Sequence, residues 1–115
     1  MRVEDYRFGR IRVDGVDYAA DLIIVGGEVR SPWRRKAGGH LFAPEDLGEV
    51  IAAVPAVVVL GTGYLGLVRI AEGTLKAFAD AGSRVVIGRT GPMVEELNLL
   101  LSEGRDVAAA LHLTC

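Results

Sequence analysis

The sequence contains almost no cysteine. Its 115 residues include a single one, Cys115, so no internal disulfide can form and a reducing cytoplasm is the expected location. The first residues, 1–6, lack the apolar segment of a secretory signal. A chain of this length predicts one domain over residues 1–115, large enough to build a core without disulfide or metal support.

A strong excess of charge is also lacking. The formal net charge is -2, which implies neither nucleic-acid binding nor attraction to a membrane surface. Residues 50–68 carry no charge and just reach the length of a membrane-spanning helix. That segment contains Pro55, several glycines and the β-branched run Val57–Val59. It therefore predicts a helix end, a buried strand and a glycine loop rather than a membrane span.

The first third of the chain predicts β structure. Apolar residues alternate over residues 6–13 and change phase at Gly9, which predicts a bulge. Asp14-Gly15 predicts a tight turn. The apolar run Leu22–Val25 predicts a buried strand.

From residue 30 onward the pattern changes from strand to loop and then to alternating helices and strands. Residues 30–39 predict a loop, and Pro44 stands near the start of a short helix. The elements predicted beyond it are strands over 56–60, 84–88 and 107–113 and helices over 72–81 and 92–103, with Leu75, Phe78 and Ala79 facing inward. This order predicts an α/β fold with a mixed, mainly parallel central sheet and the N-terminal strands as an added layer.

A glycine motif follows the first of these later strands. Gly61, Gly63 and Gly66 form the spacing G-x-G-x-x-G, which in dinucleotide-binding proteins lets the backbone approach a pyrophosphate. Here the next helix begins only near Glu72, and no acidic residue follows the next strand. The glycines therefore favour a tight turn, and we expect no nucleotide cofactor.

A basic loop surrounds the only tryptophan, Trp33. It contains Arg30, Arg34, Arg35 and Lys36, with His40 close by. One interpretation is a site for an anion or an acidic partner. The other is a solvated loop in which Trp33 caps the edge of the core.

Isolated polar residues follow the predicted strands. Thr62 and Thr90 come after two strands that we expect to be parallel neighbours, whose carboxyl ends open into one crevice. Thr90 also suits a helix N-cap, and His112 also suits a hydrogen-bonded core position. We predict a small cleft there, with these candidate residues: Trp33, His40, Gly61, Thr62, Gly63, Thr90, Asn98 and His112.

No catalytic or metal site is predicted. His112 and Cys115 are three residues apart, so in an extended strand they face opposite sides and cannot bind one metal. A Cys-His nucleophilic pair stays open as an alternative, although a cysteine at a fraying end is a poor scaffold for one.

Several short motifs together resemble a known family. They are Trp33, Gly39-His40, Asp46-Leu47, Gly61-Thr62-Gly63, Thr90, Asn98 and the segment Gly104–Cys115. In this order they resemble the adipogenesis-associated domain family, which includes an assembly factor for mitochondrial respiratory complex I. The resemblance implies a three-layer fold with a central mixed five-stranded sheet, helices and an additional β layer, and it implies no established activity or cofactor. Met93 and Leu97 stand where relatives tend to have alanine and tyrosine.

Two functions stay open at this point. The first is a binding or assembly module that holds a partner protein, which the missing acid-base constellation favours. The second is an enzyme or a binder of a small anionic ligand, which would use the predicted cleft. No nucleic acid, membrane, metal or cofactor is expected as a partner.

Overall fold

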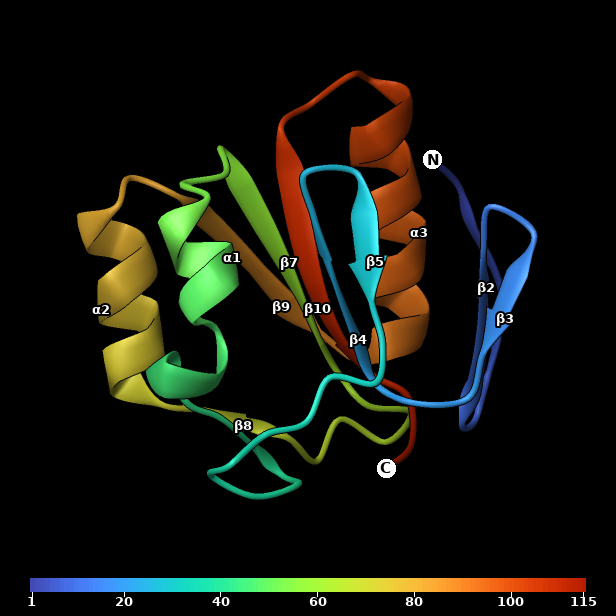
Figure 1. Ribbon diagram of the computed structural model, residues 1–115, viewed down its shortest axis with the longest axis horizontal. Helices are drawn as coiled ribbons and strands as arrows, with labels where there is room; N and C mark the ends of the chain where they lie inside the picture. Colours follow the sequence, from blue (N-terminus) through green and yellow to red (C-terminus); the bar gives the residue numbers. More distant parts are fainter.

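Ten strands and three α-helices make up the fold in the computed structural model, which describes residues 1–115 (Figure 1). The strands are β1 Val3–Arg7, β2 Arg10–Val13, β3 Val16–Tyr18, β4 Leu22–Val25, β5 Glu28–Arg30, β6 Leu41–Phe42, β7 Val57–Thr62, β8 Arg69–Ile70, β9 Arg84–Gly88 and β10 Val107–His112. The helices are a short 3-10 turn Pro44–Asp46, α1 Gly48–Ala52, α2 Glu72–Asp80 and α3 Thr90–Ser102.

The central sheet has five strands in the order β5-β4-β10-β7-β9. Strands β10, β7 and β9 run parallel, whereas β4 is antiparallel to β10 and β5 is antiparallel to β4. The prediction that the three later strands share one mixed sheet is therefore confirmed. Their apolar runs suit this position because both faces of the sheet are covered.

Alternate residues of the central strands enter two separate cores. In β4, Leu22 and Ile24 pack in a core with α3 and the N-terminal strands, and Ile23 and Val25 pack in a core on the other face. Figure 1 shows α1 and α2 on one side of the sheet and α3 on the other, with the N-terminal strands beyond α3. The predicted three layers are thus present. No helix combines the length and apolar character needed to cross a membrane.

The N-terminal layer is a three-stranded antiparallel sheet in the order β1-β2-β3. Asp14 and Gly15 form the predicted turn between β2 and β3, with φ of 49° and 80°. The prediction of a bulge at Gly9 is wrong, because Gly9 lies in the turn between β1 and β2. A register shift falls instead between Glu4 and Arg7. A bulge and a two-residue turn change the alternation in the same way, so the pattern alone does not distinguish them.

Two helix predictions need correction. Helix α3 begins at Thr90, two residues before the predicted start. In α2 the buried residues are Thr74 and Phe78, and Leu75 and Ala79 are exposed instead of facing inward. Thr74 takes the inner position because its hydroxyl donates to the Phe42 carbonyl at 2.8 Å. A threonine with a buried acceptor therefore replaces the leucine expected at the interface.

Candidate functional site

The carboxyl ends of β7, β9 and β10 meet at one edge of the central sheet. Thr62, the last residue of β7, lies opposite His112 of β10, and Gly61 lies opposite Gly88 of β9. The Thr62 hydroxyl donates to the Gly88 carbonyl at 3.0 Å. Three strand ends therefore converge at this edge, as expected for parallel neighbours.

Thr90 joins these strand ends. Its fully buried hydroxyl donates to the His112 carbonyl at 2.7 Å and accepts from the Gly63 backbone N–H at 2.9 Å. The N-cap of α3 is Arg89, and no side chain caps this helix. Thr90 thus ties together three segments and does not take the N-cap position that the sequence suggested.

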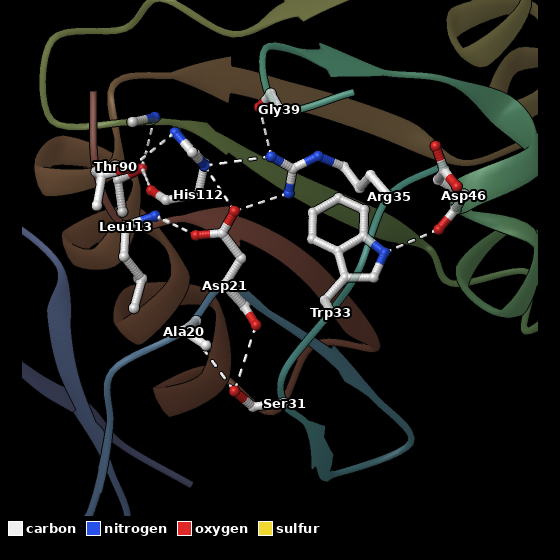
Figure 2. Close-up of polar contacts among 12 residues, drawn as sticks. Ala20, Asp21, Ser31, Trp33, Arg35, Gly39, Asp46, Thr90, His112 and Leu113 are labelled. Carbon is white, nitrogen blue, oxygen red and sulfur yellow. Dashed lines mark hydrogen bonds and ion pairs between the residues drawn. The ribbon is translucent and has the colours of Figure 1, made fainter. Parts of the chain in front are cut away.

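A buried ionic cluster lies beside Thr90, and we call Asp21, Arg35 and His112 the Asp-Arg-His cluster. Asp21 Oδ2 lies 2.6 Å from His112 Nδ1 and 2.8 Å from Arg35 Nη1 (Figure 2). The Leu113 N–H donates to Asp21 Oδ1 at 2.8 Å. The His112 Nδ1–H donates to the Asp21 carboxylate, and the other ring nitrogen, Nε2, lies 3.3 Å from Thr114 Oγ1.

Charge pairing determines the ionisation of Asp21. Burial by itself raises the pKa of a carboxyl, but hydrogen bonds from His112, the Leu113 N–H and Arg35 outweigh it, so the pKa of Asp21 lies below its ordinary value. Asp21 therefore carries its negative charge at neutral pH and holds the Arg35 guanidinium inside the protein.

Trp33 packs against the Arg35 guanidinium. The Arg35 guanidinium lies 4.7 Å from the Trp33 ring centroid and 5.2 Å from that of Phe42. Trp33 is only 8% exposed, and its indole N–H donates to the Asp46 carbonyl at 2.9 Å. Trp33 is thus a core residue and does not stand at the rim of a cleft. Arg35, by contrast, is not a solvated loop residue, because its side chain is 4% exposed.

His40 lies on the outer side of the Asp-Arg-His cluster. Its ring meets that of His112 edge-on with centroids 5.9 Å apart, and its Nε2 is 3.7 Å from Cys115 Sγ. His40 is exposed and Cys115 is half-buried. No group of three His, Cys, Asp or Glu side chains is placed to hold a metal ion.

Asn98 is the one candidate residue that lies apart from the others. Its side-chain oxygen accepts from the Val3 N–H at 2.8 Å and its side-chain nitrogen donates to the Val3 carbonyl at 2.5 Å. It therefore fastens β1 to α3, whereas the remaining candidates form one connected set around Thr90 and His112.

The structure has two clefts, and none of the eight candidate residues lines either of them. The first, which we call the tyrosine cleft, has a volume of about 290 Å³ and is lined by Tyr6, Tyr64, Arg89, Gly91 and Pro92. The second, the arginine cleft, has a volume of about 220 Å³ and is lined by Asp5, Arg7, Arg10, Ile11, Arg12 and Asp17.

The tyrosine cleft lies just beyond the carboxyl ends of β7 and β9, where Tyr64 and Arg89 follow those strands. The Tyr6 hydroxyl donates to the Leu113 carbonyl at 2.9 Å, and burial raises the pKa of Tyr6 to about 12. Tyr6 therefore lines this cleft with a phenol group that is uncharged at neutral pH. Arg89 is the only charged residue that lines it.

The glycine motif has a structural explanation in the same region. A Cβ on Gly61 would lie 2.8 Å from Thr90 Oγ1, and a Cβ on Gly63 would lie 2.6 Å from the Thr114 carbonyl oxygen. Gly63 also has a φ of 109°, which side chains rarely adopt. Close packing of the chain against itself thus accounts for these glycines without a pyrophosphate.

Sequence reasoning missed Asp21, Tyr6 and Arg89. Asp21 is 91 residues away from His112 along the chain, so their contact does not show as a motif. One usable signal was present, since Asp21 directly precedes a fully apolar strand and His112 ends another. A polar residue at the end of a buried strand needs a partner, and these two had none nearby in sequence.

These features define a three-layer α/β domain with converging strand ends and a small cleft beside them. The chain belongs to the family described as "Protein of unknown function (DUF498/DUF598)", which matches residues 3–112. No curated protein matches it.

Solved structures share the whole fold. The protein MT938 is 26% identical with a TM-score of 0.82, covering 99% of this chain and 98% of its own. The conserved hypothetical protein PH1505 from Pyrococcus horikoshii OT3 is 25% identical with a TM-score of 0.82, covering 100% of both chains. A Bordetella pertussis protein described as a Mth938-like domain is 21% identical with a TM-score of 0.74, covering 97% of this chain and 85% of its own. The fold is therefore the Mth938-like fold.

Proposed function

We propose that this protein is a binding module that holds a short segment of a partner protein in the tyrosine cleft and on the apolar surface beside it. The observation that carries the proposal is the exposure of Phe8, Tyr64, Leu65 and Leu67, each more than half exposed. We call these four residues the apolar rim. Large exposed apolar groups that gather beside a cleft are typical of interaction surfaces.

The aromatic residues of this surface contact one another. The Phe8 and Tyr64 rings pack edge to face with centroids 5.8 Å apart, and the Tyr6 and Tyr64 centroids are 6.3 Å apart. Tyrosine and phenylalanine offer large contact area with few rotatable bonds, and tyrosine is enriched in binding hot spots. The rim therefore supplies the kind of side chains that dominate binding energy.

Charge indicates the chemistry of the partner. Arg89 lines the cleft without an ion pair to any carboxylate of this chain. The Gly91 N–H lies in the first turn of α3, where the helix itself provides no acceptor. A carboxylate on the partner segment would satisfy both groups. We therefore expect a segment that combines an acidic residue with aromatic or aliphatic ones.

The loop that presents this surface is held in place by residues 114–115. The Tyr64 N–H donates to the Thr114 carbonyl at 2.7 Å, and the Leu67 N–H donates to the Cys115 carbonyl at 3.1 Å. A fixed loop lowers the entropy lost on binding. The residue before this segment is fixed as well, because the Leu113 N–H donates to Asp21 of the Asp-Arg-His cluster at 2.8 Å.

The resemblance to the adipogenesis-associated domain family agrees with a role in holding a partner, since that family includes an assembly factor for respiratory complex I. The single cysteine favours the cytoplasm as the place of action. A binding function is favoured over an enzymatic one, because the polar residues around His112 bond to one another and line no cleft.

A display library of short random peptides, selected on the whole immobilised chain, tests the proposal. We expect the enriched peptides to pair an acidic residue with aromatic or aliphatic residues. Arg89→Gln and Tyr64→Ala should each weaken the best peptide about tenfold. Leu99→Ala is the matched control, because Leu99 is equally exposed but lies outside the cleft.

Two results would overturn it. Either no peptide is enriched, or the enriched peptides bind Arg89→Gln as tightly as the unmodified chain. If peptides fail while acetate or phosphate shifts the Gly91 amide resonance, the cleft serves a small anion and the partner proposal is wrong.

A further inference from the structure

The arginine cleft is a second concave surface, separate from the tyrosine cleft. It lies on the N-terminal sheet, and its lining residues come from β1, β2 and β3. Five of its six lining residues are charged, and the sixth, Ile11, is buried. A cleft with this lining suits a charged ligand rather than an apolar one.

The charges in the arginine cleft do not cancel. Arg12 pairs with Asp17 at 2.8 Å and with Asp5 at 3.5 Å, so the two carboxylates share one guanidinium. Arg7 and Arg10 form no ion pair with any carboxylate of the chain. Their guanidinium groups are therefore the part of the cleft that is free to meet a ligand.

Arg7 and Arg10 also repel each other. They are direct cross-strand partners in the β1–β2 pair, on either side of the turn at residues 8–9. Like charges placed directly opposite one another destabilise a β-sheet. Bringing two such side chains together costs stability, and an anion between them would remove that cost.

We propose that the arginine cleft binds a phosphate-type oxyanion between Arg7 and Arg10. Each guanidinium presents two parallel N–H groups that match two oxygens of a tetrahedral oxyanion. The volume of about 220 Å³ leaves room for a phosphate group and a small substituent. Arg12 keeps Asp5 and Asp17 engaged, so these carboxylates face the guanidinium of Arg12.

This site does not depend on the proposed partner binding, since the two clefts share no residue. Arg89→Gln should weaken peptide binding about tenfold and leave oxyanion binding unchanged. If the unmodified chain binds pyrophosphate but no peptide, only the partner proposal has failed; if it binds peptides but no pyrophosphate, only the present proposal has failed.

The test uses the whole chain and pyrophosphate, inorganic phosphate and acetate as probes, at ionic strength matched with sodium chloride. Isothermal titration should show that pyrophosphate binds more tightly than phosphate and that acetate is weakest. The double variant Arg7→Gln/Arg10→Gln should weaken pyrophosphate at least about tenfold. Arg2→Gln, an exposed arginine outside the cleft, should bind as the unmodified chain does.

Thermal unfolding gives a second readout. Without ligand, the double variant should unfold at a higher temperature than the unmodified chain, because the repulsion is gone. Pyrophosphate should raise the midpoint of the unmodified chain and leave that of the double variant unchanged. Equal pyrophosphate affinity in both chains would overturn the proposal. Binding of single-stranded DNA through Arg7 and Arg10 without binding of pyrophosphate would overturn it as well.

Discussion

At the scale of single residues, the buried polar side chains act as ties within the chain. Thr62 and Thr90 bond to backbone groups at the sheet edge, and Asp21 bonds to both Arg35 and His112 in the Asp-Arg-His cluster. The residues that face solvent in the clefts are different ones, mainly tyrosines and arginines. The polar residues predicted at the strand ends are therefore buried and line neither cleft.

Asp21 should make stability depend on pH in the acid range. Its folded pKa is lowered, so the stabilisation is present above the unfolded pKa of about 3.9 and is lost as pH falls through the folded value. We expect the free energy of unfolding to drop steeply below about pH 4. Asp21→Asn should be less stable at neutral pH and should show a shallower acid drop. Urea unfolding between neutral and acid pH measures both.

An exposed carboxylate provides the control for Asp21. Asp80 pairs only with Lys76 on the surface of α2, at 2.9 Å, and both side chains are largely exposed. Surface pairs of this kind contribute little, so Asp80→Asn should leave the acid profile unchanged. Identical acid profiles for Asp21→Asn and the unmodified chain would contradict the role given to Asp21.

At the scale of elements, Asn98 of α3 attaches the N-terminal layer to the domain through its hydrogen bonds with β1. Both its side-chain groups bond to the backbone of Val3, which is 1% exposed. Asn98→Ala leaves a buried N–H and carbonyl without partners, which costs about 1–3 kcal/mol. Chemical denaturation measures this loss, and amide exchange should show faster exchange in β1 than in β7.

Glu95→Ala is the matched substitution for Asn98, since Glu95 is exposed on the same helix. It should change the free energy of unfolding by no more than about 0.5 kcal/mol. If Asn98→Ala is equally mild, or if β1 keeps its protection, Asn98 does not hold the N-terminal layer.

The elements were largely predictable because the central strands carry continuous apolar runs and because a clear turn signal separates β2 from β3. Leu22–Val25 and Asp14-Gly15 are examples. The prediction for Leu75 was wrong because Thr74 bonds to Phe42, a contact that local periodicity does not contain. The prediction for Gly9 was wrong because a turn and a bulge change the alternation alike. The same holds for the candidate site. That Thr62 and Thr90 lie at the same edge of the sheet follows from the parallel strands, but the partner of His112 comes from the other end of the chain.

At the scale of the whole molecule, the segment after β10 connects the sheet with the proposed binding surface. His112 belongs to the Asp-Arg-His cluster, Leu113 bonds to Asp21 and Tyr6, and residues 114–115 hold the loop that carries Tyr64 and Leu67. Residues 112–115 therefore contact the strand ends, the N-terminal layer and the loop. A change at the junction should disturb stability and binding together.

Gly63→Ala tests this connection. Its Cβ would lie 2.6 Å from the Thr114 carbonyl oxygen and 2.7 Å from that of Cys115, so residues 114–115 must move. Gly38→Ala is the matched control, because Gly38 has a φ of 106°, close to the 109° of Gly63, but nothing lies within 4 Å of its Cβ. Both variants carry a backbone cost of about 1–3 kcal/mol, and Gly63→Ala should lose clearly more in urea unfolding. Amide exchange at Tyr64 and Leu67 should accelerate in Gly63→Ala alone, and peptide binding at the tyrosine cleft should fall with it. Equal losses in the two variants would mean that the contact with residues 114–115 does not support the loop.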